Sequence, residues 1–468
     1  MIEPLARDLT SPGYVAKALY LAVALAAAAT FACAPLKRAA VTHPPESPKA
    51  MMTVPSPESA RAIEALVNKV ETRVAALRGL PSKSPVQYKP LGPDELRRVL
   101  NKAMDEQLPP EMLPSVEFVL RRLGLLGREQ DLRKILMGLY SEQVAGLYDE
   151  ETARLFVVTS FNLKTALAEL VLAHEICHAL QDQNYNLSKW PLKKKDNDDE
   201  AYAALSALEG DAMLVMNEYA VRYVSPGRML LDLPSMIYMM AGQQNLNSAP
   251  YFLQQEMIFP YAQGGNFLAT AIARDKREEV FQRRPRSTEQ ILHPDKYFAE
   301  TPDEPLAVSL KPFDKTAPWR WGRLCANTMG EMGIRIFLEA NGVPNARKAA
   351  EGWGGDSYAL YAPKRSEPRK DAYAFVWKTR WDTETDAAEF AQAMERVVTE
   401  RLFEGATITK DEAILCCKAN DAIALLAQNK KDVIYVDAAS DDLARQMLAA
   451  AEKQQAVGGE KGGAKDKG

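Results

Sequence analysis

The sequence predicts an α+β protein that is predominantly helical, and three observations lead to this fold class. Apolar residues recur at helical spacing over most of the first half of the chain. One short stretch, AGLYDEETARLFVVT, instead reads as two strands joined by a turn. After about residue 305, β-branched and aromatic runs alternate with helical segments. A chain of 468 residues also exceeds what one hydrophobic core usually supports, so we expect more than one domain.

The individual elements follow from the same patterns. Ile63, Leu66, Val70 and Val74 fall on one helical face, and Pro93-Asp94-Glu95 opens a second helix with acidic residues in its first turn. Two more helices are expected over 113–126 and 131–139. The strand pair is followed by a helix from Leu163 onward that Ser160 or Asn162 caps.

The C-terminal region is expected to be a separate mixed α+β region. A helix over 323–340 ends at Asn341-Gly342, because a glycine there favours the left-handed conformation that ends helices. The strands expected after it are SYALYAP, DAYAFVWKTRW, EAILCCKAND and DVIYVDA, and two further helices are expected over 385–403 and 441–452.

The composition is that of a globular protein, with 47% hydrophobic and 26% charged residues. The net charge of −4 and the lack of a basic stripe argue against a nucleic-acid partner. Of the five cysteines, Cys177, Cys325, Cys416 and Cys417 show no metal-ligand spacing. We therefore interpret these four as free, buried apolar side chains rather than as a disulfide framework.

The N-terminus is typical of a secretory leader. The uncharged run ALYLAVALAAAATFACAPL lies between Lys17 and Lys37, and Cys33 stands where bacterial lipoproteins carry their lipidated cysteine. The alternative is an uncleaved membrane anchor, since such a run is long enough to span. The acidic residues before Lys17 are unusual for a leader, and translation from Val15 would remove them.

These observations divide the chain into six expected parts. They are a leader over 1–33, a flexible tether over 34–58, a helical region over 59–145, a site-bearing domain over 146–304, the α+β region over 305–455 and a disordered Gly/Lys tail over 456–468.

The chain has only four histidines, and two of them form the motif LAHEICHALQ. His174 and His178 lie one helical turn apart, so both project from one face. Two imidazoles at this spacing bind a single zinc ion, and Glu175, about 100° round the helix, is placed as a general base. Chance placement of H-E-x-x-H in such a chain is rare, roughly one chain in several hundred by composition.

A third ligand is expected from the segment DDEAYAALSALEGDAMLVMNEYA. Glu209 lies in the middle of its apolar stripe, where an unpaired carboxylate is costly and a metal ion would neutralise it. Asp211 becomes the ligand if the helix has a different register. Otherwise Asp211 and Asp182 are candidate outer-shell partners, because ligand histidines usually donate their second N–H to an acceptor.

The segments HEICHALQDQ and ALEGDA resemble the gluzincin zinc metallopeptidases, and more closely a set of bacterial envelope proteins of unknown role. The resemblance covers roughly residues 145–300. It implies a zincin-like metallopeptidase fold for 146–304, with His174, His178 and Glu209 as zinc ligands and Glu175 as the base. Many gluzincins carry an Asp four residues after the ligand Glu, and here that position is Met213.

Peptide hydrolysis also needs a donor to the oxyanion. The candidates are Tyr148, Tyr202, Tyr219 and His293, the last within RPRSTEQILHPDKY, a segment that also resembles the envelope set. The strand ARLFVV is a candidate edge on which an extended peptide substrate pairs.

The expected function is therefore that of a zinc-dependent peptidase held at the bacterial envelope by its lipid anchor. The alternatives are a non-catalytic envelope protein with a vestigial or structural metal site, and a helical scaffold without metal. The sequence leaves open the substrate, the oligomeric state, and whether residues 59–145 are a removable pro-segment.

Overall fold

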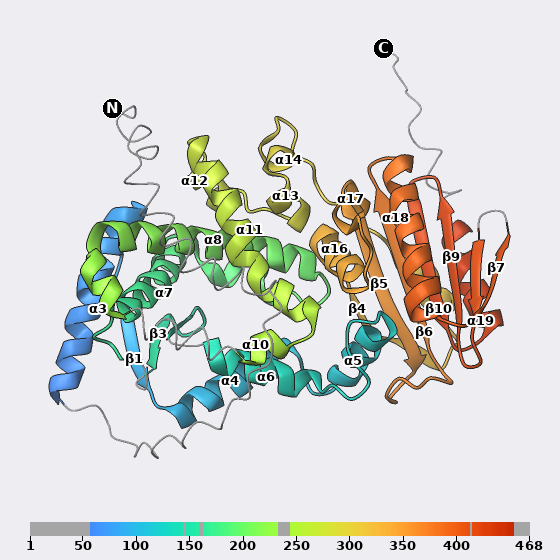
Figure 1. Ribbon diagram of the computed structural model, residues 1–468, viewed down its shortest axis with the longest axis horizontal. Helices are drawn as coiled ribbons and strands as arrows, with labels where there is room; N and C mark the ends of the chain where they lie inside the picture. The colour runs from blue at the N-terminus through green and yellow to red at the C-terminus, as the bar shows by residue number, and fades with distance from the viewer. Residues whose placement is uncertain (1–56, 144–145, 159–161, 233–243, 412–413, 454–468) are drawn as a thin grey trace, which may run out of the picture. The chain divides into compact units, whose positions relative to one another are not determined.

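The computed structural model describes residues 57–143, 146–158, 162–232, 244–411 and 414–453, and it is a mixed α+β structure (Figure 1). The chain divides into two compact units, neither of which is a continuous stretch. The first consists of residues 1–101, 137–190 and 208–249, and the second of 102–136, 191–207 and 250–468. The domain limits drawn from the sequence stay predictions.

The first unit carries the histidine motif. Its elements are α3 (Pro57–Arg78), β1 (Gln87–Leu91), α4 (Pro93–Gln107), α6 (Leu132–Gln143), β2 (Gly146–Asp149), β3 (Arg154–Val158), α7 (Ala166–Tyr185), the 3-10 helix Leu187–Lys189, α8 (Asp198–Tyr223) and α10 (Gln244–Ser248), of which α4, α6 and α8 also contribute residues to the second unit.

The two strands expected before the motif are confirmed, but they belong to a three-stranded sheet with the order β1-β3-β2. β2 pairs with β3 in the antiparallel sense, and β1 pairs with β3 in the parallel sense. The sequence pattern missed β1, QYKPL, because Pro90 argues against a strand unless it lies at an edge. β3 is therefore the central strand, and its expected role as a free edge is wrong, since both of its edges are paired.

Helix α7 is buried on nearly all of its faces. Apolar residues of α3, α7 and α8 share one core, which includes Val70 and Val74 of α3, Ile176 and Leu180 of α7, and Val215 of α8. A helix surrounded in this way requires a partner for each of its buried polar side chains.

The start of α7 differs from the expectation. Thr165 is the N-cap, and its hydroxyl accepts a hydrogen bond from the Ala168 backbone N–H at 3.1 Å. Asn162 instead accepts from the backbone N–H of Lys164 in the turn before the helix. Ser160 lies outside the described residues.

Replacing Thr165 with alanine is expected to lower the free energy of unfolding by about 1 kcal/mol, because the Ala168 N–H loses its acceptor. Urea unfolding of the metal-free protein measures this. Thr72→Ala is the matched control: Thr72 is exposed within α3, where its hydroxyl only donates to the Asn68 carbonyl. Equal stability of the two variants would contradict the assignment of Thr165 as the cap.

The second unit contains the expected C-terminal α+β region. Its elements are α5 (Leu113–Arg122), the 3-10 helix Pro191–Lys193, α11 (Tyr251–Ala273), α12 (Arg277–Gln282), α13 (Thr288–Leu292), α14 (Pro294–Phe298), α15 (Lys311–Thr316), β4 (Trp321–Asn327), α16 (Gly330–Ala340), α17 (Ala346–Ala350), β5 (Trp353–Pro363), β6 (Ala374–Trp381), α18 (Glu384–Val397), the π-helix Val398–Leu402, β7 (Thr407–Asp411), β8 (Ile414–Lys418), β9 (Ile423–Asn429), β10 (Asp432–Ala438) and α19 (Asp441–Lys453).

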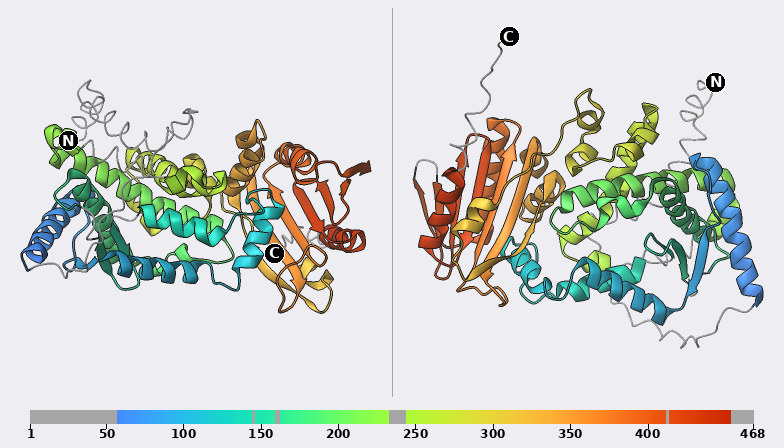
Figure 2. Two further views of the ribbon diagram at one scale, coloured as in Figure 1. Left: turned by 60° about the horizontal axis from the view of Figure 1, so that its bottom comes forward. Right: turned by 180° about the vertical axis from the view of Figure 1, so that it is seen from behind.

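Its sheet is antiparallel, with the strand order β4-β5-β6-β10-β9-β8-β7. Alternate residues of β5, β6, β8, β9 and β10 face two separate cores, whereas β7 is exposed along its length. On β10, Val433 and Tyr435 pack with α18, whereas Ile434 and Val436 pack with α19. The two helices therefore cover opposite faces of the sheet (Figures 1 and 2).

Most of the C-terminal expectations are confirmed, with two corrections. The expected helix over 323–340 is a strand, β4, up to Asn327, and a helix only from Gly330. The edge pairing of β4 with β5 decides this, which no local pattern reveals. β7 and β9 were not expected. The end at Asn341-Gly342 is confirmed, with Gly342 at a φ of 79°.

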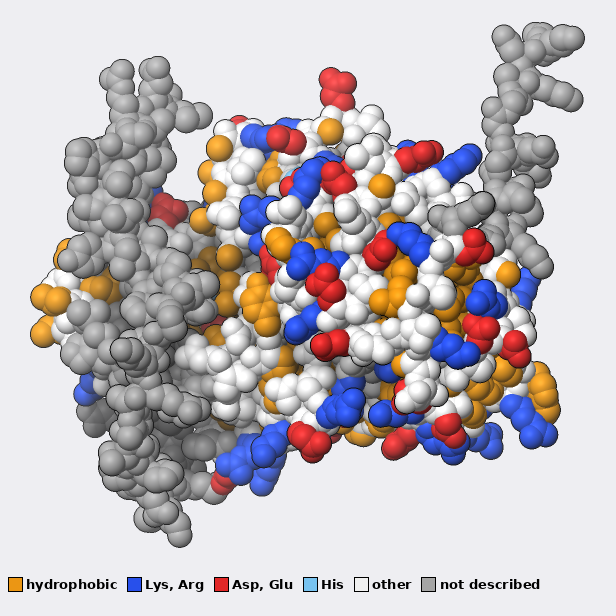
Figure 3. Space-filling model, turned by 45° about the vertical axis from the view of Figure 1, so that its right-hand side comes forward, with side chains coloured by type: hydrophobic (Ala, Val, Ile, Leu, Met, Phe, Trp, Pro, Cys, Tyr) orange, Lys and Arg blue, Asp and Glu red, His pale blue; other side chains and the backbone are white. Residues whose placement is uncertain are grey.

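Basic and acidic side chains are interspersed on the face drawn in Figure 3. In the described part of the chain, ion pairs join charged side chains across one helical turn, as between Arg396 and Glu400, or between neighbouring elements, as between Lys410 and Glu395. Exposed pairs of this kind contribute little to stability, and they keep the surface mixed in charge.

Among the described residues, no helix is long and apolar enough to cross a membrane. Cys33, the leader, the tether up to residue 56 and the tail from residue 456 lie outside the described residues. Cys177, Cys325, Cys416 and Cys417 are free, as expected; Cys177 and Cys417 are buried, while Cys325 and Cys416 are only partly so.

Candidate metal centre

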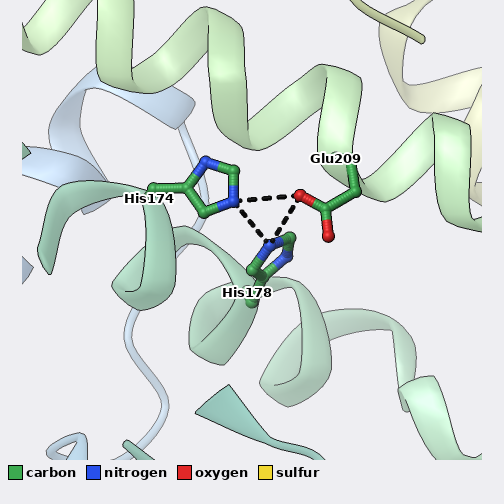
Figure 4. A group of neighbouring side chains, drawn as sticks. All are labelled: His174, His178 and Glu209. Atoms are coloured by element: carbon green, nitrogen blue, oxygen red, sulfur yellow. Dashed lines mark hydrogen bonds and ion pairs between the residues drawn. The ribbon is translucent and has the colours of Figure 1, made fainter. Parts of the chain in front are cut away.

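Three side chains that the sequence singled out converge in the first unit. His174 and His178 project from one face of α7, and Glu209 projects from α8 (Figure 4). His174 Nε2 lies 3.0 Å from Glu209 Oε2 and 3.1 Å from His178 Nε2. His178 Nε2 lies 3.4 Å from Glu209 Oε2. The three ligand atoms form a compact triangle within 4.8 Å of one another.

This triangle fits a zinc ion. Two ligand atoms that are each about 2.0–2.2 Å from a tetrahedral ion lie about 3.3–3.6 Å apart. The three separations are within a few tenths of an ångström of that range. Two imidazole nitrogens and one carboxylate oxygen are also the donor set of many catalytic zinc sites, which leave a fourth position open.

The charges of the three side chains are coupled. Burial alone would lower the pKa of His178, but the charge of Glu209 and its hydrogen bond outweigh this and raise the pKa to about 9. Burial alone would also raise the pKa of Glu209, but His178 and His174 lower it far below its usual range. Glu209 is thus held as a carboxylate, and the centre favours a positive charge beside it.

Glu175 is held by the neighbouring sheet. Its Oε2 accepts a hydrogen bond from the backbone N–H of Tyr148 in β2, at 2.8 Å. Since that N–H is directed at Glu175, it does not point toward β3. The outer edge of β2 therefore faces the glutamate of the motif, and in the described part of the chain β2 is an edge strand.

The outer contact of His178 differs from both expected partners. Gln181 Oε1 lies 2.9 Å from His178 Nδ1. Asp182 instead accepts from the Tyr148 hydroxyl at 2.7 Å and from the Leu187 backbone N–H at 2.8 Å.

Asp211 is connected to His178 only through Gln181, since Asp211 Oδ2 accepts a hydrogen bond from Gln181 Nε2 at 2.9 Å. The same oxygen pairs with Arg78 Nε of α3 at 2.6 Å. The helix register is thus the one that places Glu209 toward the histidine pair. Asp211 neutralises a buried arginine instead.

A second buried carboxylate fixes α3 to α7. Glu169 pairs with Lys69, Arg73 and Arg228, and accepts from the Tyr219 hydroxyl. Burial alone would raise the pKa of Glu169, but hydrogen bonds from Tyr219, Lys69 and Arg228 lower it to about 2. Together with the shared core, this makes α3 an integral part of the first unit rather than a segment laid over it.

The four candidate oxyanion donors have other contacts in the structure. The Tyr148 and Tyr219 hydroxyls donate to Asp182 and Glu169. Tyr202 belongs to the second unit, where its side chain hydrogen-bonds Glu256. His293 also belongs to the second unit, and its Nε2 lies 2.8 Å from Glu331 Oε1. The role of His293 stays a prediction.

Another acidic group of similar compactness already holds a cation. Glu289, Asp303 and Asp382 of the second unit lie close enough together to bind a metal ion. However, Lys296 Nζ lies 2.5 Å from Glu289, 2.8 Å from Asp303 and 2.7 Å from Asp382. An ammonium group surrounded by three carboxylates leaves little need for a metal ion there.

Comparison with known proteins adds one finding. A family model described as a domain of unknown function, DUF8575, matches residues 319–447. This match runs from just before β4 into the first half of α19, within the C-terminal region expected over 305–455, and it covers less than half of the chain. We found no curated protein and no solved structure that matches the chain.

Proposed function

We propose that this protein is a zinc-dependent peptidase, with a zincin-like site in the first unit and a lipid anchor at the bacterial envelope. The observation that carries the proposal is the convergence of His174, His178 and Glu209, within a few tenths of an ångström of the spacing that a tetrahedral zinc ion requires. The anchor at Cys33 rests on the sequence of the leader.

The two histidines would hold the ion through Nε2, and Glu209 through Oε2. A zinc ion held there would supply Lewis-acid chemistry, that is, activation of water and polarisation of the carbonyl group under attack. Glu175 performs the proton transfers. One of its oxygens is oriented by the Tyr148 N–H, and its carboxylate takes a proton from the attacking water and later passes it to the leaving amine.

The outer edge of β2 supports a peptide as the substrate. An extended chain that adds to an exposed edge strand is a common mode of peptide recognition. β2 replaces β3 in this role, because β3 is paired on both sides. A peptide beside β2 would lie next to Glu175, since the Tyr148 N–H on that edge reaches this carboxylate.

Replacing Glu175 with glutamine tests the reaction. The variant is expected to keep about one zinc ion per chain, because Glu175 is not a ligand, and to cleave peptides roughly 10²–10⁴-fold more slowly, because it lacks the base. Full-length protein purified in detergent is incubated with a pool of unstructured peptides, and cleavage is followed by mass spectrometry. Zinc is measured by elemental analysis.

Glu218→Gln is the matched control, since Glu218 lies on α8 and pairs with the exposed Arg222. Equal cleavage by the wild type and Glu175→Gln would overturn the assignment of Glu175. If the wild type binds zinc but cleaves no peptide in the pool, the metal centre stands and the peptidase activity is contradicted.

A further inference from the structure

We infer that Gln181 is a positioning residue that holds the His178 imidazole in its metal-binding tautomer; this inference rests on the proposed zinc site. Gln181 is fully buried, with 0% exposure, and it lies one turn beyond His178 on α7. A buried amide requires partners for its oxygen and its nitrogen. The structure provides them all, and they determine which way the amide points.

The nitrogen side of the amide faces two groups that only accept. Gln181 Nε2 donates to the Leu208 carbonyl at 3.2 Å and to Asp211 Oδ2 at 2.9 Å. Turning the amide over would place its oxygen against these two oxygens. The orientation is therefore fixed, and Oε1 must face His178.

The oxygen side then determines the tautomer. Gln181 Oε1 can only accept, so His178 Nδ1, at 2.9 Å, must carry the proton. The lone pair of a neutral His178 is then on Nε2, which is the atom that faces His174 Nε2 and Glu209 Oε2. The opposite tautomer would lose the Nδ1 hydrogen bond and direct an N–H at the metal position.

The chain of contacts ends in a buried ion pair. Asp211 Oδ2, which receives Gln181 Nε2, also pairs with Arg78 Nε, and the two side chains are 0% and 1% exposed. An acceptor held by a buried guanidinium has little freedom to move. Arg78, Asp211, Gln181 and His178 thus form one continuous path from the end of α3 to the metal centre.

Outer-shell partners of this kind typically change metal affinity by 10–100-fold. Zinc affinity is measured on the full-length protein by competition with a chelator, for the wild type, Gln181→Glu, Gln181→Met and Gln183→Met. Glutamate keeps an oxygen that accepts from Nδ1–H, whereas methionine fills the buried space but accepts no such bond. Gln183 is the matched control, since its amide bonds exposed backbone at Lys83 and Ser84.

The expected order of affinity is wild type, then Gln181→Glu, then Gln181→Met about 10–100-fold below the wild type, with Gln183→Met unchanged. If Gln181 only filled space, the order of zinc affinity of its two variants would be reversed, because burying a carboxylate costs more free energy than burying a thioether. The second readout is nitrogen NMR of the zinc-loaded protein, which is practical with only four histidines. Here the Nδ1–H of His178 should exchange slowly with water in the wild type and faster in Gln181→Met.

Two outcomes would overturn the inference, and they are distinguishable. If Gln181→Met binds zinc as tightly as the wild type, or more tightly than Gln181→Glu, the positioning role is wrong and the zinc site remains. If the wild type itself binds no zinc, the proposed function fails together with the inference.

Discussion

Glu209→Ala and His178→Ala are each expected to lose zinc under conditions in which the wild type keeps about one ion per chain. Each substitution leaves two protein ligands, and catalytic zinc sites require three. The loss of affinity should exceed the roughly 10–100-fold that removal of an outer-shell partner costs. Peptide cleavage is expected to fall together with the zinc content, because the proposed reaction requires the bound ion.

The measurement is zinc content after gel filtration in the presence of a weak chelator. Glu218→Ala is the control on the same helix as Glu209, since Glu218 pairs with the exposed Arg222 and lies two and a half helical turns after Glu209, roughly 13 Å along α8. Circular dichroism shows whether each variant keeps its helices. If all folded variants retain zinc like the wild type, the three side chains do not form the metal site.

Arg78→Met is expected to lower the free energy of unfolding by about 3–5 kcal/mol. The substitution leaves Asp211 as a buried carboxylate without its cation, and breaking a buried pair from one side has this cost. The same change loosens the acceptor of Gln181, so zinc affinity should fall as well, in the range of outer-shell substitutions.

Urea unfolding of the metal-free protein measures the effect, and hydrogen exchange at α7 and α8 localises it. Arg61→Met on the same helix is the control, because Arg61 is exposed and surface substitutions usually change stability by less than about 0.5 kcal/mol. Equal stability of the two variants would contradict the importance of the Arg78–Asp211 pair. This prediction also bears on the open question of a pro-segment: if α3 were removable, its last residue would not stabilise the unit.

The sequence by itself identified the parts of the protein that have strong local signals. The spacing of His174 and His178 and the position of Glu209 in an apolar stripe were enough to propose a site, because residues four apart on a helix project from the same face. Periodicity also predicted α3, α7 and α8 and the strand pair β2 and β3, and a glycine suited to the left-handed conformation predicted the end of the helix at Asn341-Gly342.

Only the tertiary structure decided the contacts made across long separations in sequence. β3 is a central strand because β1 pairs along its second edge. The paired residues Gln87 and Arg154 are 67 positions apart in the sequence. The partner of His178 is Gln181 rather than Asp182 or Asp211, because both aspartates accept hydrogen bonds from other groups. Asp182 accepts from the Tyr148 hydroxyl and the Leu187 N–H, and Asp211 pairs with Arg78. The local sequence pattern indicates which side chains share a helix face. Which polar side chain a buried group bonds to depends on the segments, distant in sequence, that pack around it in the folded core.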